Sequence, residues 1–283
     1  GGTQFGKVLF REEKRHPFGS CPSPRKPFLM TDFHLIQSDL TWEDIDVNLK
    51  HLERQISSIH SGAIILPEMF STGFSMNSAK LAENMMGKTV TWLKEQARLK
   101  QVYICGSIII EENGRYFNRF LWVSPNGVVT AYDKRHLFRM AGEHNHYSAG
   151  SDRVQLRIND IQLRPQVCYD LRFPAWSRNT TGYDVLLYVA NWPAARRAHW
   201  MTLLQARAIE NLAYVIAVNR VGKDGNELVY AGDSCVIDPW GNYLLKMDAE
   251  EGIGSVKLDL GSLREYREAF PAHLDADVLE IKT

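Results

Sequence analysis

The stretch Arg164-Pro165-Gln166-Val167-Cys168-Tyr169-Asp170-Leu171-Arg172-Phe173-Pro174 decides how the chain is interpreted. Upstream of Cys168, apolar and β-branched residues alternate with polar ones, as in a partly buried strand. These residues are Ile158, Ile161, Leu163 and Val167. Downstream, Pro174 suits the first turn of a helix, where its missing N–H leaves no hydrogen bond unmade. The pattern predicts a cysteine between a strand end and a helix N-terminus, where backbone N–H groups favour a thiolate and an oxyanion.

A lone cysteine on an apolar strand is usually a small buried hydrophobic side chain. This stretch by itself therefore leaves a structural and a catalytic role for Cys168 open. The choice depends on which other chemically active side chains the chain brings to the same place.

The composition is that of a globular protein with a sizeable core. The chain has 283 residues, of which 45% are hydrophobic and 23% are charged. Lys plus Arg number 33 and Asp plus Glu number 33, so the formal net charge is zero. This balance gives no support to a nucleic-acid surface or a polybasic membrane anchor. No apolar run is long enough to span a bilayer, and we expect neither nucleic acid nor membrane as a partner.

The cysteines point to a reducing compartment. Cys21, Cys105, Cys168 and Cys235 lie far apart, with neither CxxC nor CxxH spacing. This spacing argues against a zinc site and against a dense disulfide framework. We therefore expect a cytoplasmic protein.

The N-terminal segment differs from the rest of the chain. It is rich in charged residues and proline, and it lacks the apolar region of a signal peptide. We expect residues 1–28 to form a poorly ordered tail, derived in part from an expression vector at Gly1-Gly2. Residues 29–283 show no linker or low-complexity run, which predicts a single domain.

Strand and helix patterns alternate from residue 31 onward. Residues 33–37, 62–68 and 102–110 are strand-like, and helical spacing of apolar residues follows the first two of them. Thr41 is the expected N-cap of the first helix, with Asp44 in the capping-box position. The alternation predicts an α/β fold with right-handed crossovers and helices on the outside of a sheet.

Two Pro-x-Gly hairpins suggest that the fold has two similar halves. Ser124-Pro125-Asn126-Gly127 joins one pair of strands and Asp238-Pro239-Trp240-Gly241 joins another. Each follows a set of strands and helices, and in the second half these lie at 183–191, 198–211 and 214–220. We expect each half to supply one sheet, with the two sheets facing one another. Such turns are common, so the repeat is not decisive by itself.

Three predicted strands end in residues that can do chemistry, namely Glu68, Lys134 and Cys168. Ligands gather at the carboxyl ends of strands in layered α/β folds. Taken alone, Glu68 fits a structural role, as an N-cap or in an ion pair, as well as it fits a catalytic role. Taken alone, Lys134 fits a solvated surface lysine. Taken together, a carboxylate can deprotonate the thiol, and the ammonium can stabilise a tetrahedral oxyanion. The Tyr169 backbone N–H is the expected second oxyanion donor.

The three stretches around these residues resemble the signature blocks of the nitrilase (carbon–nitrogen hydrolase) superfamily, in order and at comparable spacing. The blocks are Leu66-Pro67-Glu68-Met69-Phe70, Tyr132-Asp133-Lys134-Arg135-His136-Leu137-Phe138 and residues 167–174. The likeness covers roughly residues 31–265. It implies that Glu68 is the general base, Lys134 the oxyanion-stabilising lysine and Cys168 the nucleophile. It further implies that Glu143 is a second glutamate that orients the lysine and the substrate.

The resemblance also implies the architecture and the assembly. It implies a four-layer α-β-β-α sandwich, in agreement with two halves, and a homodimer packed through helices on one face, or a higher homo-oligomer. Neither a metal nor an organic cofactor is expected. Residues 72–76, 140–144 and 191–193 look most like the omega-amidase branch. Those enzymes hydrolyse the terminal amide of small ω-monoamides of dicarboxylates, such as 2-oxoglutaramate.

A small acid substrate needs a cation for its carboxylate. Arg196 or Arg197 could provide one through a bidentate contact, although both also fit the solvated start of a helix. We take Arg196 as the candidate. Four further residues complete the expected substrate site, with the aromatic ones as walls that ordinary packing would explain equally well. They are Phe74, Tyr169, Asn191 and Trp192.

Other functions remain open at this stage. A papain-like Cys–His pair is disfavoured because Glu68 supplies a base and no papain-type motif surrounds Cys168. His144 and His146, with only Glu143 nearby, fit no closed zinc pattern. A catalytically silent binding protein would normally lack one of the three key residues. Nitrile or N-carbamoyl amino acid hydrolysis would use the same three residues as amide hydrolysis.

Overall fold

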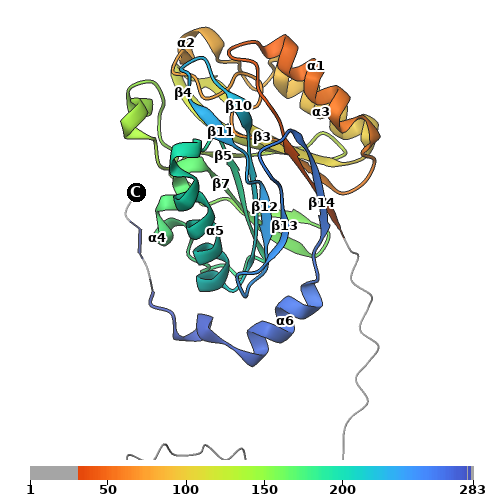
Figure 1. The fold of residues 1–283 in the computed structure, drawn as a ribbon, viewed down its shortest axis with the longest axis vertical. Helices are drawn as coiled ribbons and strands as arrows, with labels where there is room; N and C mark the ends of the chain where they lie inside the picture. The colour runs from red at the N-terminus through yellow and green to blue at the C-terminus, as the bar shows by residue number, and fades with distance from the viewer. Residues whose placement is uncertain (1–30, 279, 282–283) are drawn as a thin grey trace, which may run out of the picture.

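Two six-stranded sheets form the centre of the molecule (Figure 1). The computed structural model describes residues 31–278, 280 and 281, so the predicted tail at 1–28 lies outside the described residues. From edge to edge, the first sheet consists of β14 (Gly252–Lys257), β1 (Asp32–Gln37), β2 (Ala63–Ile65), β3 (Tyr103–Glu112), β4 (Arg115–Val123) and β5 (Val129–Asp133). The second consists of β13 (Tyr243–Lys246), β12 (Cys235–Ile237), β9 (Tyr214–Asn219), β8 (Val185–Ala190), β7 (Ile161–Val167) and β6 (Leu156–Ile158).

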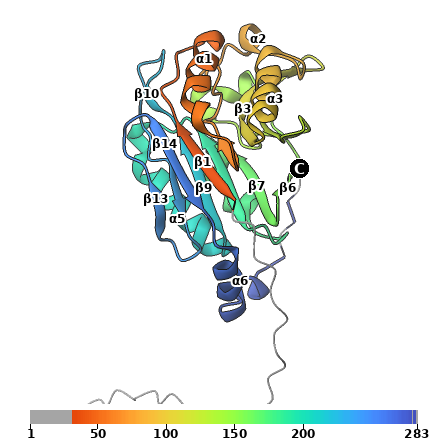
Figure 2. The same cartoon turned by 90° about the vertical axis from the view of Figure 1, so that its right-hand side faces the viewer.

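Helices cover the outer face of each sheet. Alternate residues of the parallel strands point to opposite faces, and both faces are apolar, as strands buried on both sides require. On the first sheet, α1 (Ile45–Gln55) and α3 (Lys88–Lys100) pack against Ile64 and Ile104. On the second sheet, α5 (Arg197–Asn211) packs through Trp200 and Leu204. Figures 1 and 2 show α1 and α3 on the side of the sheets opposite to α5.

The inner faces of the two sheets form a common core. Leu35, Ile65 and Phe120 of the first sheet belong to one apolar cluster with residues of the second sheet, such as Val167 and Leu187. Strand β1 lies against β9, and β4 lies against β7. Two apolar sheet faces must be buried against something, and here each buries the other. The predicted four-layer α-β-β-α sandwich is confirmed.

The strand pairing repeats between the halves. In the first half, β1, β2 and β3 pair in parallel and β4 and β5 are added antiparallel. In the second half, β7, β8 and β9 pair in parallel and β12 and β13 are added antiparallel. Each sheet also has an antiparallel edge strand next to its first parallel strand, β14 beside β1 and β6 beside β7. The two predicted Pro-x-Gly hairpins join β4 to β5 and β12 to β13.

The remaining elements are short and include those that carry the site. Strands β10 (Val221–Lys223) and β11 (Val229–Ala231) form a separate two-stranded ribbon. The short helices are α2 (Ser78–Leu81), α4 (Pro174–Ser177) and the 3₁₀ helices η1 (Ile56–Ser58), η2 (Arg139–Ala141), η3 (Glu143–Asn145), η4 (Cys168–Arg172), η5 (Ala194–Arg196) and η6 (Ala272–Asp275). Helix α6 (Leu260–Ala269) follows β14.

The expected N-cap of the first helix is wrong. The α1 helix begins after Asp44, whose Oδ1 accepts a hydrogen bond from Val47 N at 3.0 Å. Thr41 instead lies a turn earlier, and its main-chain N–H donates to Asn48 Oδ1. An aspartate caps a helix N-terminus better than a threonine does, because its charge also complements the helix dipole.

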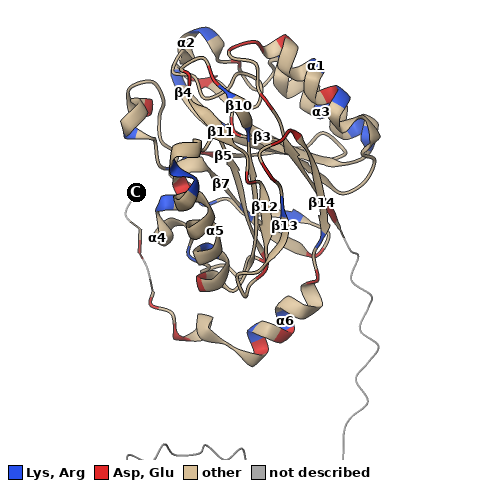
Figure 3. Cartoon of the chain, in the orientation of Figure 1, with Lys and Arg blue, Asp and Glu red and all other residues tan. Residues whose placement is uncertain are grey.

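The outside of the described chain is of mixed charge. Figure 3 shows basic and acidic residues interspersed along helices such as α3, α5 and α6, in line with the zero formal net charge. Among residues 31–278, 280 and 281, no helix combines the length and the apolar character needed to cross a bilayer.

Candidate active site

Cys168 lies at the end of β7, in a turn that we call the Cys168 turn (residues 167–174). Its φ is +45°, in the left-handed region that non-glycine residues rarely adopt. Strand β7 ends at Val167, and the short helix η4 starts at Cys168. Helix α4 then begins with Pro174 at its first position, as predicted. A strained backbone of this kind persists only where the surroundings hold it in place.

Asp170 holds the Cys168 turn in place. Its Oδ2 accepts hydrogen bonds from Val167 N at 3.0 Å and from Tyr132 Oη at 2.7 Å. Its Oδ1 accepts from His136 N at 2.9 Å and lies 2.8 Å from His136 Nδ1. Tyr132 and His136 flank Lys134 in the sequence, so this buried carboxylate ties the Cys168 turn to the segment that carries Lys134.

Lys134 lies between two carboxylates, and we call Lys134, Glu68 and Glu143 the Lys134 cluster. Lys134 Nζ is 2.9 Å from Glu68 Oε1 and 3.0 Å from both Glu143 oxygens, and all three side chains are 0% exposed. Glu68 follows β2, Lys134 follows β5 and Glu143 begins η3. Glu68, which is 66 residues from Lys134 in the sequence, and Glu143, which is nine residues from it, thus meet at the same ammonium.

Electrostatics keeps the ammonium charged. Burial alone would lower the pKa of Lys134, but the carboxylates of Glu143 and Glu68 outweigh burial and raise that pKa above its usual value. Burial raises the pKa of Glu143, although Lys134 acts in the opposite direction. The cluster therefore offers a fixed positive charge next to carboxyl groups that can exchange a proton.

The Cys168 thiol lies beside this cluster. Its Sγ is 3.8 Å from the main-chain oxygen of Asn191, and a hydrogen bond also links the thiol to Glu68. Burial, followed by the charge of Glu68, raises the pKa of Cys168 well above its usual value. The position at the start of a short helix therefore does not by itself keep Cys168 ionised. A neutral thiol needs a base, and Glu68 is within hydrogen-bonding reach of it.

Two asparagines complete the surroundings of Glu68. Asn118 Nδ2, from β4, donates to Glu68 Oε1 at 2.7 Å, and Asn191 N, just after β8, donates to Glu68 Oε2 at 2.8 Å. Sequence reasoning placed Asn191 in the site but missed Asn118. The available signal was a polar residue in a strand of otherwise largely apolar and aromatic character, because such a residue needs a buried partner.

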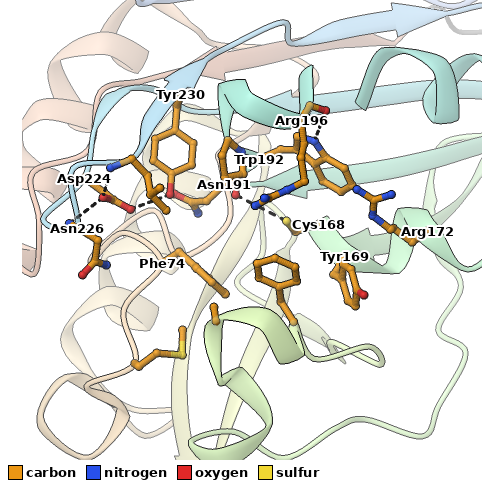
Figure 4. Close-up of a pocket in the computed structure, with 15 residues that line it drawn as sticks. Phe74, Cys168, Tyr169, Arg172, Asn191, Trp192, Arg196, Asp224, Asn226 and Tyr230 are labelled. Atoms are coloured by element: carbon orange, nitrogen blue, oxygen red, sulfur yellow. Dashed lines mark hydrogen bonds between the residues drawn. The ribbon is translucent and has the colours of Figure 1, made fainter. Parts of the chain in front are cut away.

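A cavity of about 310 Å³ opens over Cys168 (Figure 4). All the residues predicted for the substrate site line this cavity. They are Phe74, Tyr169, Asn191, Trp192 and Arg196. Figure 4 shows Arg196 extending toward the middle of the cavity near Cys168. The guanidinium carbon of Arg196 lies 5.2 Å from the centre of the Phe138 ring. Lys134 Nζ lies 5.0 Å from the centre of the Phe74 ring.

The neighbouring arginines have different environments. Arg197 makes two hydrogen bonds to Asp233, of 2.6 and 2.7 Å, and does not line the cavity. Arg172, which sequence reasoning did not single out as a site residue, does line it; this side chain stacks over Trp192 at 5.1 Å and contacts His199 Nδ1 at 2.8 Å. Arg172 ends the same short helix that begins with Cys168, so proximity to the cysteine was its available signal.

The β10–β11 ribbon supplies the opposite wall of the cavity. Asp224, Asn226, Leu228 and Tyr230 line it from this side. Tyr230 Oη donates to Asp224 Oδ2 at 2.8 Å, and Asp224 Oδ1 accepts from the main-chain N–H groups of Asn226 and Leu228. These bonds hold the loop between the strands in one shape. The sequence offered no periodicity that marked this ribbon.

His144, His146 and Glu143 are the potential metal ligands that lie close together in the sequence. Within the described residues, no group of three or more His, Cys, Asp and Glu side chains is arranged to hold a metal ion. His144 lies within η3, directly after Glu143, and His146 follows that short helix.

Comparisons with known proteins give a consistent result. The carbon-nitrogen hydrolase family matches residues 35–268. The chain is 49% identical over 247 residues to "Omega-amidase YafV" of Escherichia coli (strain K12), covering 86% of this chain and 95% of that protein. It is 36% identical over 248 residues to a "2-oxoglutaramate amidase" of Bacillus subtilis (strain 168), covering 85% and 95%. The crystal structure of XC1258 from Xanthomonas campestris, described as a CN-hydrolase superfamily protein with an arsenic adduct in the active site, superposes with a TM-score of 0.88 at 41% identity, covering 90% of this chain and 100% of that one.

Proposed function

The chain belongs to the carbon–nitrogen hydrolase family, and on that premise we propose that it hydrolyses the terminal amide of small ω-monoamides of dicarboxylates, such as 2-oxoglutaramate. The products are the dicarboxylate and ammonia, formed through a cysteine thioester. One observation carries the proposal: the buried Lys134 cluster adjoins the Cys168 thiol on the floor of a small cavity. The names of two similar proteins, an omega-amidase and a 2-oxoglutaramate amidase, support the choice of amide.

In the first half-reaction, Glu68 takes the proton of Cys168 and the thiolate attacks the amide carbon. The oxyanion that forms is stabilised by Lys134 Nζ and the Tyr169 N–H. Because the ammonium is preorganised between Glu68 and Glu143, it needs no reorganisation when the charge develops. Protonated Glu68 then gives its proton to the leaving nitrogen, the carbon–nitrogen bond breaks, and ammonia leaves behind a thioester.

In the second half-reaction, water replaces ammonia. Glu68 takes a proton from the water as the oxygen attacks the thioester carbon, and the same two donors stabilise the second oxyanion. The carbon–sulfur bond breaks, the thiolate recovers its proton from Glu68, and the acid leaves. Glu143 keeps Lys134 oriented throughout. In this scheme, these residues and water provide all the chemistry.

The walls of the cavity support a short acid as the substrate. Phe74, Trp192 and Tyr169 enclose it with aromatic surface, and a volume of about 310 Å³ suits a molecule of a few carbons. Arg196 is the proposed partner of the free carboxylate. In the described part of the chain, no carboxylate forms an ion pair with it, whereas Arg197 is held by Asp233.

We also propose a homodimer in the cytoplasm. The homodimer follows from the family resemblance. The cytoplasm is supported by Cys105, Cys168 and Cys235, which are free thiols in the structure. Sedimentation of the purified protein should give twice the monomer mass of 32.3 kDa; a monomer would contradict the assembly.

The test is ammonia release by wild type and by Cys168→Ala. The panel contains 2-oxoglutaramate, succinamate, asparagine, a simple nitrile and an N-carbamoyl amino acid. We expect turnover of the first two by wild type and loss of all turnover in Cys168→Ala, with an unchanged fold. Cys235→Ala, which removes a buried thiol from β12, is the matched control and should retain turnover. An active Cys168→Ala protein, or turnover confined to the nitrile or carbamoyl compound, would overturn the proposal.

A further inference from the structure

The side-chain amide of Asn118 contacts both carboxylates of the Lys134 cluster, and the proposed mechanism assigns no role to this residue. Asn118 is 1% exposed, and its Nδ2 lies 2.7 Å from Glu68 Oε1 and 3.4 Å from Glu143 Oε1. A donor at 2.7 Å from a carboxylate makes a strong charge-assisted hydrogen bond, whereas 3.4 Å is near the limit of hydrogen bonding. Asn118 therefore favours Glu68 over Glu143.

The other donors do not favour Glu68. Lys134 Nζ lies 2.9 Å from one oxygen of Glu68 and 3.0 Å from both oxygens of Glu143. One main-chain N–H serves each glutamate, Asn191 N for Glu68 and Phe138 N for Glu143. Among these side-chain and main-chain donors of the described residues, Asn118 is the one whose hydrogen bond is clearly shorter to Glu68 than to Glu143.

This difference matters because the Lys134 cluster has more carboxyl groups than ammonium groups. Two carboxylates and one ammonium leave an excess negative charge, which burial disfavours. Burial raises the pKa of Glu143, so a shared proton has a place to reside there. Besides Glu143, the ionisable groups that face Glu68 are Lys134 and Cys168, with Tyr147 also within electrostatic reach.

The oxygen of the same amide also indicates that its N–H group has a role. Asn118 Oδ1 is buried and has no hydrogen-bond partner among the described residues. An unpaired buried acceptor costs stability, and an apolar residue of similar shape would avoid that cost. The reversed orientation would place this oxygen against the carboxylates. What Asn118 contributes is therefore the bond from Nδ2 to Glu68.

We propose that Asn118 is a positioning residue that fixes the Glu68 carboxylate and biases the shared proton toward Glu143. Asn118 and Lys134 engage Oε1 and Asn191 N engages Oε2, so the carboxylate that bonds the thiol is held at both oxygens. Glu68 then enters each turnover as the base and Glu143 does not. The inference rests on the proposed function for its role in turnover, but its effect on Cys168 can be measured without any substrate.

The test uses Asn118→Leu and Asn118→Ala, which both remove the N–H donor without adding a charge; leucine also keeps a similar shape. The rate at which iodoacetamide alkylates Cys168 is followed against pH by peptide mass spectrometry. Losing a hydrogen bond to a charged group should slow alkylation near neutral pH by about tenfold or more and shift the acidic limb of the profile to higher pH. If Asn118→Leu does not fold, Asn118→Ala, which adds no bulk to the buried site, gives the same measurement.

Asn48→Leu is the matched control. Asn48 is also a buried asparagine, and its Nδ2 donates to the main-chain oxygens of Thr41 and Ser71. Its replacement should lower thermal stability and leave the alkylation profile unchanged. A wild-type profile in the folded Asn118 variants, or the same shift in Asn48→Leu, would show that Asn118 only packs.

Ammonia release separates the two proposals. With a positioning role, kcat on an ω-monoamide should fall about tenfold or more in the Asn118 variants, while KM changes by less than about twofold. A wild-type protein that releases no ammonia would refute the proposed function, and alkylation would still decide the role of Asn118. An active wild type with unchanged kcat and alkylation in the variants would refute the inference alone.

Discussion

The two halves of the molecule share one strand topology but carry different chemistry. The strand pairing makes β2 the counterpart of β8, β1 the counterpart of β7 and β5 the counterpart of β13. Glu68 follows β2, where the second half has Asn191 after β8. Cys168 follows β7, where the first half has Ser38 after β1, and Lys134 follows β5, where the second half has Met247 after β13.

The comparison shows why a repeated framework makes a single site. The counterparts Glu68 and Asn191 lie in contact, through Asn191 N to Glu68 Oε2 and Asn191 Nδ2 to the Glu68 main-chain oxygen. Face-to-face sheets therefore bring equivalent strand ends together at one place. The first half supplies the charged groups there, and the second half supplies the thiol. We expect mutations in the two halves to have different signatures.

The largest effect should come from the charged half, with Lys134→Met. The variant loses the oxyanion donor, so kcat should fall by about 10³-fold or more. It also leaves two carboxyl groups at 0% exposure without their ammonium, which should cost about 3 to 5 kcal/mol in the free energy of unfolding. Ammonia release and chemical denaturation measure the two effects.

The pH dependence of this variant sharpens the prediction. Burial already raises the pKa of Glu143, and Lys134 opposes that shift, so its loss should raise the pKa further. A carboxyl group whose folded pKa exceeds its unfolded value destabilises the fold as pH rises through that interval. The Tm of Lys134→Met should therefore fall from about pH 5 to about pH 8 relative to wild type. A parallel pH dependence in the two proteins would contradict a buried, mutually dependent cluster.

The sequence predicted the framework and the reactive groups because both leave local signals. Buried parallel strands are continuous apolar runs, and Pro174 and the Pro-x-Gly turns have fixed backbone preferences. What it did not predict depends on long-range pairing. Strand β14 joins β1 across more than 200 residues, and Asn118 acquires its meaning only from Glu68 and Glu143. The turn at Asn113 and Gly114, with φ of 54° and 73°, was a local signal that could have located the β3–β4 hairpin.

A smaller effect should follow from Asp170→Asn, at the junction of the halves. The carboxylate of Asp170 joins the Cys168 turn to Tyr132 and His136 on either side of Lys134. An amide keeps the shape but cannot accept all of these hydrogen bonds. We expect a loss of about 1 to 3 kcal/mol in the free energy of unfolding and a fall in kcat of about 10- to 100-fold.

The graded control for this prediction is Tyr132→Phe. It removes the bond from the tyrosine hydroxyl to Asp170 and the bond that this hydroxyl accepts from Trp176 Nε1, but it keeps the Asp170 carboxylate and its bonds to Val167 N and His136 N. Thermal unfolding and kcat should therefore both change less than in Asp170→Asn. If kcat is unchanged in Asp170→Asn while stability falls, the junction supports the fold without positioning Cys168 against Lys134. That outcome would mean that the link between the two halves through Asp170 is not needed for turnover.

The smallest effect should come from the cavity wall of the second half, with Arg196→Met. Losing a charged contact to the substrate carboxylate should raise KM by about tenfold or more for an ω-monoamide acid, with kcat changed much less. An uncharged amide of similar size should show no change in KM. Arg197→Met is the matched control, because Arg197 pairs with buried Asp233 and should affect Tm rather than KM. If KM rises instead in Arg172→Met, the carboxylate is bound from the short helix that carries Cys168, and the second half then supplies both nucleophile and anchor from one element.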